Sequence, residues 1–334
     1  MQRAARNHPG ADWTPPVEAW EGELPAVMDA SIVYLGCEGD AGPDFRRQVR
    51  DALGAADART HVEYARFETA EGRPTTVAIT YWLNRSAYEA WRASDAALRT
   101  LDPSAYAGGP GIWTESYAVK RQNIETLFSS DDQSPGFAAL AADGVGDPTP
   151  LHGYYGSMRD RIWASNDSDH KSDVETVART ALQRPAGEVR ITAPKSLCAI
   201  RSGQDWSLCE GDQKRLYKED VEPVLLKGME YLQQNPEASG CLSCRFMRET
   251  DADGRDKDRT FGYAIFREMA DLEAWSKLHP THVAIFGTFM KYAQSFNNEI
   301  DLRLWHEVLV TIDQQTFTYN QCGAETGLSP FFAS

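Results

Sequence analysis

The segment Ile79 to Trp91 (ITYWLNRSAYEAW) decides the fold, because Tyr263 to Trp275 (YAIFREMADLEAW) matches it 184 residues later. Both segments begin with a short apolar run typical of a buried strand, continue through a polar turn, and end in a helical stretch with Glu-Ala-Trp. Self-similarity of this kind within one chain indicates an internal repeat. We therefore predict that the two halves of this 334-residue chain share one architecture.

Each matched segment lies within a series of predicted elements that has the same order in both halves. The elements are centred on residues 31–35, 44–53, 62–67, 79–91 and 112–119, and on 197–201, 213–232, 241–246, 263–275 and 302–312. The order strand, helix, two strands, helix, strand is that of a ferredoxin-like domain. Its sheet carries helices on one face only, so two copies would cover each other by packing sheet on sheet. The prediction is an α+β fold of duplicated ferredoxin-like repeats that form a dimeric α+β barrel within one chain.

Composition divides the chain into three parts. Residues 1–25, with Pro15 and Pro16 among several charges, are predicted to be an N-terminal arm that wraps the surface. Residues 26–150 would hold the first repeat plus a linker, because the stretch 128–150 is rich in Ser, Asp, Gly and Pro. Residues 151–334 would form the second repeat and carry the candidate site.

Charge and composition argue against several classes of partner. The net charge of −15 disfavours nucleic acid and anionic lipid, since binding either one needs clustered Lys and Arg. No apolar run is long enough to span a membrane, and the first residues lack the apolar core of a secretion signal. The six cysteines do not have the spacing of a disulfide scaffold and are interpreted as free thiols of a cytoplasmic protein. Cys241 and Cys244 form a C-x-x-C without a second pair, which does not favour zinc or redox chemistry.

His282 is predicted to lie on an apolar helix face. Pro280 would end the preceding turn, Thr281 would cap the next helix, and that helix would run from about residue 282 to 296. Helical spacing places three further side chains on the face of His282: Phe286, Phe289 and Ala293. A histidine on such a face is more often a hydrogen-bonded core residue than a ligand, so this position alone does not predict a site.

His306 is predicted to lie in a strand of alternating pattern. It would point into the barrel together with Leu304, Val308 and Val310. Trp305 and Glu307 would face the opposite way. Taken alone, an inward histidine of this kind is also more often structural than catalytic.

The internal repeat changes the interpretation of both histidines. The offset aligns His282 with Leu98, and the closing strands align His306 with Thr114. The first half has neither imidazole, so the scaffold does not need them for folding. We therefore predict that His282 and His306 belong to one asymmetric site in the second half.

Other kinds of site have less support in the sequence. A zinc or non-haem iron site would need a third protein ligand at a suitable spacing, and Glu307 would face away from His306. The chain has no glycine-rich phosphate loop, no G-x-S-x-G motif and no C-x-x-C-H haem attachment. If haem binds, one imidazole would hold it non-covalently and leave its opposite face open to a substrate.

Several motifs resemble, in the same order, those of the haem-containing aldoxime dehydratases. They are Glu125-Thr-Leu, Gly153-Tyr-Tyr-Gly-Ser-Met-Arg-Asp-Arg161, Arg201-Ser-Gly-Gln-Asp-Trp206, Val221-Glu-Pro-Val-Leu225, Gly240-Cys-Leu-Ser-Cys-Arg-Phe246 and His279-Pro-Thr-His282. The resemblance extends over nearly the whole chain and is densest from residue 150 to 310. It implies a lyase that converts aldoximes (R-CH=N-OH) to nitriles and water, with the oxime nitrogen bound to the ferrous iron of haem b. It also suggests a homodimer.

The resemblance implies roles for five residues. His282 would be the proximal ligand of the haem iron, His306 the distal acid–base group, and Ser202 the hydroxyl that hydrogen-bonds the oxime oxygen. Arg161 and Glu125 match two further polar residues of the distal side and could keep His306 charged. Hydroxide is a poor leaving group, so breaking the N–O bond requires a proton, which a histidine can deliver near neutral pH.

Alternatives stay open at the level of the sequence. Another haem enzyme of this barrel class, such as a peroxidase, would differ in its dependence on the redox state of the iron. A non-catalytic haem-binding module would be indifferent to the loss of Ser202 or His306. The chain also departs from the family at Gly323, where relatives often have a histidine, and in the segment 294–301, which is longer than in some relatives. The sequence does not distinguish aryl-aliphatic from alkyl aldoximes.

Overall fold

The first half of the chain has the predicted order of elements. The computed structural model describes residues 13–54, 60–132, 134–141, 144–154, 156–174 and 187–332. The first half consists of β2 (Asp29–Glu38), α1 (Gly42–Leu53), β3 (Thr60–Glu68), β4 (Pro74–Trp82), α2 (Arg85–Arg92), α3 (Asp95–Thr100) and β5 (Gly111–Lys120). The segment that begins at Ile79 thus spans the end of β4, a turn whose Asn84 side chain caps the next helix, and α2.

The second half has the same order with longer helices. It consists of β9 (Cys198–Asp205), α5 (Gly211–Leu216), a π-helical turn (Tyr217–Val221), α6 (Glu222–Gln234), α7 (Pro236–Ser239), β10 (Cys241–Thr250), β11 (Asp256–Phe266), α8 (Met269–Leu278), α9 (Pro280–Ser295) and β12 (Arg303–Val310). The helix predicted over 213–232 is interrupted by the π-helical turn, because Pro223 near the start of α6 has no N–H for a regular helical bond.

The stretch 128–150, predicted to be a linker, in part belongs to the sheet. Here β6 (Ile124–Phe128) and β7 (Val145–Pro148) pair with β1 (Trp20–Gly22), which comes from the predicted arm. The Gly and Pro content of the stretch suggested a loop. Its ordered structure is stabilised by the burial of Phe128 and Phe137 in the core, which composition does not reveal. Residues 1–12 of the arm lie outside the described residues. The remaining elements are α4 (Ser157–Arg161), β8 (Glu188–Ala193), β13 (Gln315–Asn320) and α10 (Ser329–Phe332).

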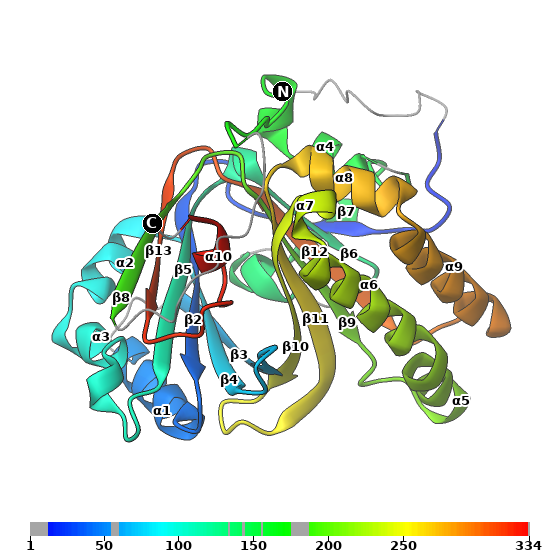
Figure 1. The fold of residues 1–334 in the computed structure, drawn as a ribbon. Helices are drawn as coiled ribbons and strands as arrows, with labels where there is room; N and C mark the ends of the chain where they lie inside the picture. The colour runs from blue at the N-terminus through cyan, green and yellow to red at the C-terminus, as the bar shows by residue number, and fades with distance from the viewer. Residues whose placement is uncertain are drawn as a thin grey trace.

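The described residues form one antiparallel sheet of thirteen strands. Figure 1 shows how the sheet runs through both halves. Its order is β7-β1-β6-β12-β9-β11-β10-β3-β4-β2-β5-β13-β8, and the halves join where β3 pairs with β10. The inner faces of the halves also pack on each other, since Tyr34 stacks on Tyr263 at 4.0 Å and the Tyr117 and Tyr263 hydroxyls are 2.6 Å apart. The predicted face-to-face packing is therefore present, but the two halves are also edge-to-edge neighbours.

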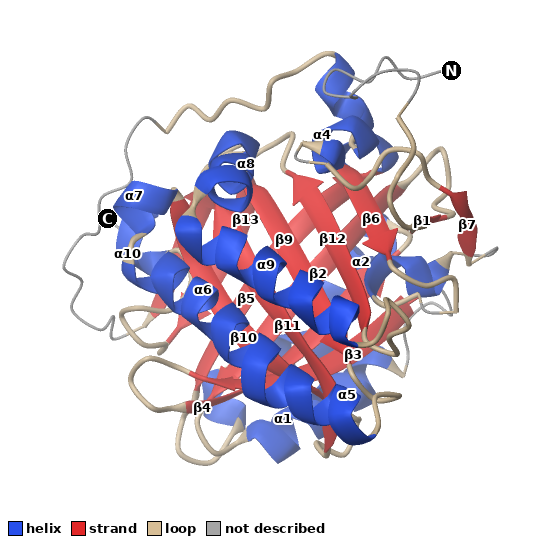
Figure 2. Ribbon diagram, turned by 90° about the vertical axis from the view of Figure 1, so that its right-hand side faces the viewer, coloured by secondary structure: helices blue, strands red, loops and turns tan. Residues whose placement is uncertain are grey.

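Helices cover the outer face of the sheet. In Figure 2, α6 and α9 lie side by side across the strands of the second half. Within the described parts of the chain, no helix is both long and apolar enough to cross a membrane. The helices and the outer sheet face of the second half enclose the space where the candidate site lies.

His306 lies on the outer face of the sheet, which corrects the predicted direction. Trp305 and Glu307 point into the barrel, while His306 points toward the helices of the second half. Alternation assigned these side chains to the correct two groups but did not show which group fills the barrel. The deciding contact is long-range: a Cβ on Gly203 would be only 2.1 Å from the Trp305 ring, so the barrel accommodates the indole over a glycine.

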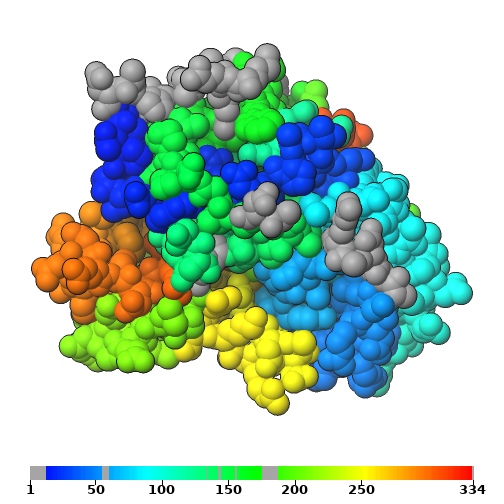
Figure 3. Space-filling view, turned by 180° about the vertical axis from the view of Figure 1, so that it is seen from behind, coloured from blue at the N-terminus to red at the C-terminus, as the bar shows by residue number. Residues whose placement is uncertain are grey.

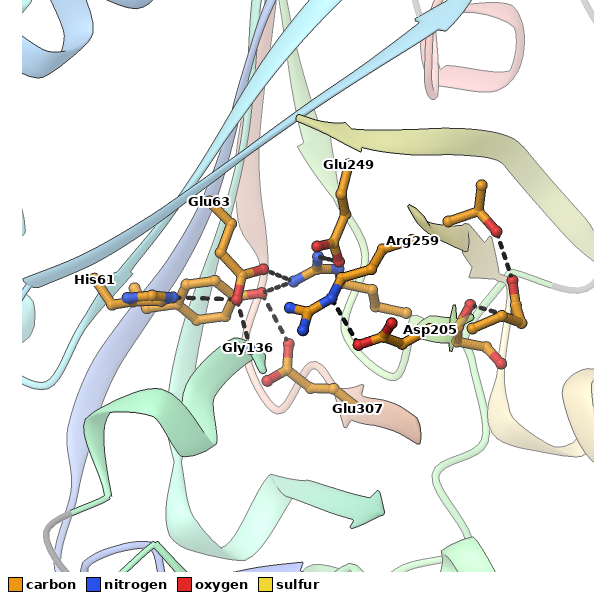
Figure 4. A network of polar contacts seen from close by, with 12 residues as sticks. His61, Glu63, Gly136, Asp205, Glu249, Arg259 and Glu307 are labelled. Carbon is orange, nitrogen blue, oxygen red and sulfur yellow. Dashed lines mark hydrogen bonds and ion pairs between the residues drawn. The ribbon is translucent and has the colours of Figure 1, made fainter. Parts of the chain in front are cut away.

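The barrel interior behind His306 contains a cluster of buried charges, shown in Figure 4. The Arg201 guanidinium donates to Glu63, to Glu249 at 3.1 Å and to the Tyr81 hydroxyl at 2.7 Å. Glu307 accepts from the backbone N–H of Phe137 at 2.8 Å and from the Tyr81 hydroxyl at 3.5 Å. Burial raises the pKa of Glu307 to about 7, because these contacts and the nearby Arg201 only partly replace the lost water.

The raised pKa of Glu307 predicts that its contribution to stability depends on pH. The folded protein holds this proton up to about pH 7, whereas in an unfolded chain the carboxyl has its ordinary pKa of 4.5. The free energy of unfolding should therefore fall as pH rises through this window, by roughly 3 kcal/mol from this group. Glu307→Gln should remove that dependence, so its stability relative to wild type should increase between pH 5 and 8 in urea unfolding.

The exposed position Glu299 offers a control for the loss of one negative charge. Glu299→Gln should not reproduce the change in pH dependence, because no buried carboxyl is replaced. A difference between wild type and Glu307→Gln that is the same at pH 5 and pH 8 would contradict the prediction.

Candidate active site

A cavity of about 500 Å³ lies between the outer sheet face and the helices of the second half. Strands β9, β11 and β12 form one wall, and helices α6, α8 and α9 form the other. Much of the lining is apolar, including Leu225, Met229, Ile285 and Phe289. A largely apolar cavity with a few polar groups is typical of a site for a cofactor or a small organic molecule.

His282 belongs to the helix wall, in the first turn of α9. Phe286 and Phe289 line the cavity with it, as the helical spacing predicts. The helix begins two residues earlier than expected. His279, not Thr281, is its cap, because the His279 side chain accepts from the Thr281 N–H, and Pro280 is the first helical residue. This cap sets the helix so that His282 faces the cavity.

The His282 imidazole is suited to bind a metal. Burial lowers its pKa, although a backbone hydrogen bond with Ser276 acts in the opposite direction. Its Nδ1 is buried and has no hydrogen-bond partner among the described residues, and Trp275 packs edge-on at 4.7 Å. A neutral imidazole beside an apolar space is what a haem iron requires of its ligand. The residues of this wall therefore fit a haem.

Ser202 and His306 belong to the sheet wall. They lie directly opposite each other on the paired strands β9 and β12, and both line the cavity. Residues opposite each other in an antiparallel pair hold their side chains close together on one face. The two polar groups thus face the helix wall, and His282, as a pair.

Glu125 and Arg161 form a buried network with His306. Arg161 lies at the end of the short helix α4, which starts after Gly156 in the left-handed region (φ 91°). Its Nε donates to Glu125 Oε2 at 2.7 Å, and both side chains are almost completely buried. Glu125 is held on β6, which pairs with β12 beside His306. The resemblance to known dehydratases implied this grouping, and the geometry brings all four residues together.

The His306 ring meets both members of this pair at one nitrogen. His306 Nε2 is 3.0 Å from Glu125 Oε1 and 3.0 Å from Arg161 Nη2. Burial alone would raise the pKa of Glu125, but the charges of Arg161 and His306 outweigh it and lower that pKa to about 2. A protonated Nε2 can donate to the ionised Glu125, and an unprotonated Nε2 can accept from Arg161. The network therefore has a partner for His306 in either protonation state.

His152 is a cavity residue that the sequence analysis missed. Its side chain is 4% exposed and lines the cavity. It follows Leu151, whose carbonyl accepts from Arg161 Nη1 at 2.5 Å. The residue lies in an irregular segment, where no periodicity indicates which side chains point inward. Its position next to the motif that ends at Arg161 was the one signal in the sequence.

The N-terminal arm closes one side of the cavity. Val17, Glu18 and Ala19 line it, and the Trp13 indole donates to the His152 carbonyl at 3.1 Å. In Figure 3 the first described residues, in blue, lie against the green segment around residue 150 and near the orange α9. The arm is thus part of the site as well as of the surface.

Comparisons with known proteins agree with this geometry. The sequence model of a family described as haem-containing dehydratase matches residues 34–328. An aliphatic aldoxime dehydratase of Rhodococcus globerulus is 31% identical over 325 residues, which cover 95% of this chain and 91% of the relative. A phenylacetaldoxime dehydratase of Bacillus sp. (strain OxB-1) is 28% identical over 347 residues, which cover 99% of this chain and 95% of the relative.

A solved structure is similar over the whole chain. It is a crystal structure of an aldoxime dehydratase in complex with butyraldoxime, with a TM-score of 0.90 and 29% sequence identity. The match covers 100% of this chain and 94% of that one.

Proposed function

The chain belongs to the haem-containing dehydratase family, and on that premise we propose that it dehydrates aldoximes to nitriles in the cavity between His282 and His306. The enzyme is a lyase with haem as its cofactor. The proposal rests on the histidines that the two walls of the cavity present, His282 on the helix wall and His306 on the sheet wall. One wall presents the imidazole of His282, whose pKa is lowered by burial, and the other presents a histidine within a charged network.

His282 would hold the haem as its proximal ligand. When bound as ferrous haem b, the cofactor supplies an iron atom that can coordinate the oxime nitrogen and lend electron density to the N–O bond. The apolar walls around it would exclude water and accommodate the hydrocarbon part of the substrate.

Ser202 and His306 would act on the oxime oxygen from the sheet wall. The Ser202 hydroxyl would donate a hydrogen bond to this oxygen and orient it. Because the network engages Nε2 of His306, its Nδ1 is the ring nitrogen available to the cavity. A proton delivered from Nδ1 would let the oxygen leave as water.

The same ring would complete the reaction. After it gives up its proton, His306 stays in place, because Nε2 keeps a partner in Glu125 or Arg161. The free Nδ1 could then accept the carbon-bound proton, which leaves the nitrile and restores the charged ring. Glu125 and Arg161 would act as positioning residues, since they act through His306.

We also propose that the two halves are copies of one ferredoxin-like unit. The equal order of elements and the equivalent packing of Trp113 over Gly36 and Trp305 over Gly203 support this origin. The domain division, the homodimer and the cytoplasmic location stay predictions from the sequence.

One experiment tests the function directly. The protein is purified with haem, reduced without oxygen, and given butyraldoxime or phenylacetaldoxime while nitrile is measured. We expect a Soret band and nitrile formation that depends on reduction. A protein without a Soret band would contradict the haem assignment. Turnover of peroxide instead of oxime would favour the peroxidase alternative, and haem without any turnover would favour the binding module.

The buried pair of Arg161 and Glu125 predicts a large loss of stability when one partner is removed. Arg161→Met leaves an ionised Glu125 in a site that is closed to water, which should cost roughly 3–5 kcal/mol. The double variant Arg161→Met with Glu125→Leu has no buried charge at this position and should regain part of that loss. Urea unfolding measures both variants. Equal stability of the single and double variants would contradict the prediction.

A further inference from the structure

His152 has an unsatisfied nitrogen in the cavity wall. Its Nε2 is buried and has no hydrogen-bond partner among the described residues, although the side chain is only 4% exposed. A buried polar atom without a partner is costly, so it indicates a ligand that satisfies it. The proposed function gives His152 no part, although the residue lines the same cavity as Ser202 and His306.

Arg161 places His152 on the distal side, near His306. One guanidinium nitrogen, Nη1, donates to the Leu151 carbonyl at 2.5 Å, directly before His152. The other, Nη2, is 3.0 Å from His306 Nε2. A single buried side chain therefore connects the backbone next to His152 to the ring of His306, and both residues line the cavity.

The surroundings of His152 keep its ring neutral. Burial and the positive charge of Arg161 lower its pKa, while a backbone hydrogen bond with Val17 acts the other way. His306 differs because the ionised carboxylate of Glu125 lies 3.0 Å from its ring. A neutral imidazole has one nitrogen that donates a hydrogen bond and one that accepts. A neutral His152 could therefore accept a hydrogen bond from a ligand.

The hydroxyl group of an aldoxime has a hydrogen that needs a hydrogen-bond acceptor in the cavity. In the proposed function, Ser202 and the charged His306 both donate to the oxime oxygen. The hydrogen on that same oxygen then needs an acceptor within the closed cavity. We propose that His152 is a third distal binding residue, whose Nε2 accepts the hydrogen bond from the oxime O–H and so selects aldoximes with a free hydroxyl. This inference rests on the proposed function, because it assumes that an oxime occupies the cavity.

The N-terminal arm would support this role. Trp13 donates to the His152 carbonyl, and the backbone of Val17 bonds to the ring. The first contact fixes the backbone of His152 and the second restricts the rotation of its ring, which a binding residue needs for a defined acceptor direction.

The test compares two ligands that differ in one hydrogen-bond donor. Butyraldoxime has the O–H group, and its O-methyl ether does not. The dissociation constants of both for the haem-loaded protein are measured from the change in its visible spectrum, without turnover. His152→Leu should weaken butyraldoxime binding by about tenfold, the value of one hydrogen bond of this kind, and leave the ether nearly unchanged. His152→Gln, which keeps an acceptor, should recover part of the affinity.

His170 provides a matched control. It is also 4% exposed and bonds to Ser165, but it does not line the cavity. His170→Asn should bind both ligands as wild type does. An equal loss of affinity for both ligands in His152→Leu, or no loss for either, would overturn the proposal. Neither result would affect the proposed function, which fails only when wild type itself binds and converts no oxime.

Discussion

His282→Ala is expected to be purified without haem. The imidazole lines the cavity from the first turn of α9, and its buried Nδ1 lacks a partner among the described residues. Replacing it with a methyl group removes the imidazole that would hold the iron. The measurement is the Soret absorbance per protein chain, after expression with an ample supply of haem. We expect the band to be nearly absent.

His279→Ala is the control for His282→Ala. His279 is three residues away, caps the same helix and stacks on Tyr231 at 3.9 Å. His279→Ala should lower the free energy of unfolding by about 1 kcal/mol. Its haem content should equal that of the wild type. As a further check, His282→Gly should take up haem again when imidazole is added, because the small ligand can replace the missing ring. Full haem content in His282→Ala would overturn the assignment of the proximal ligand.

His306→Ala is expected to keep its haem and lose its turnover. The residue lies on the sheet wall, opposite His282, so the binding of the cofactor should not depend on it. Loss of the group that delivers and recovers the proton should lower kcat by roughly 10²- to 10⁴-fold. The measurements are the visible spectrum and the rate of nitrile formation with the reduced protein.

Thr114→Ala is the matched control for His306→Ala. Thr114 occupies the equivalent register position on β5 in the first half, beside Leu35 on β2. It should not alter the rate, because Thr114 is not among the residues that line the cavity. The reverse pattern, in which His306→Ala loses haem and His282→Ala keeps it, would exchange the roles of the two histidines.

The sequence predicted the order of elements and the grouping of the site for different reasons. Periodicity and the internal match predicted both halves, because strands and amphipathic helices leave a regular trace. The absence of histidine at Leu98 and Thr114 indicated one asymmetric site. Only the resemblance to known dehydratases implied Glu125 and Arg161. They come from β6 and α4, which are too short and irregular to show a pattern.

What the sequence did not predict depends on contacts between distant segments. The direction of His306 follows from the packing of Trp305 over Gly203, which no local pattern encodes. The strands within 128–150 and the role of the arm depend on tertiary pairing with β1 and on contacts of Trp13. His152 lies in such an irregular segment, so its inward position was visible only in the fold.

The two faces of β9 and β12 have a consequence for insertions in this family. A shift of β12 by one residue would bring Glu307 into the apolar cavity and His306 into the barrel, so such a change is strongly opposed. The segment 294–301, which the resemblance predicts to be longer than in some relatives, would therefore have to absorb any extra length before the strand starts. It contains a tight reversal, where Asn297 and Asn298 both have positive φ, at 55° and 64°. We therefore expect that this end of the molecule can gain or lose residues during evolution or engineering and leave His306 where it is.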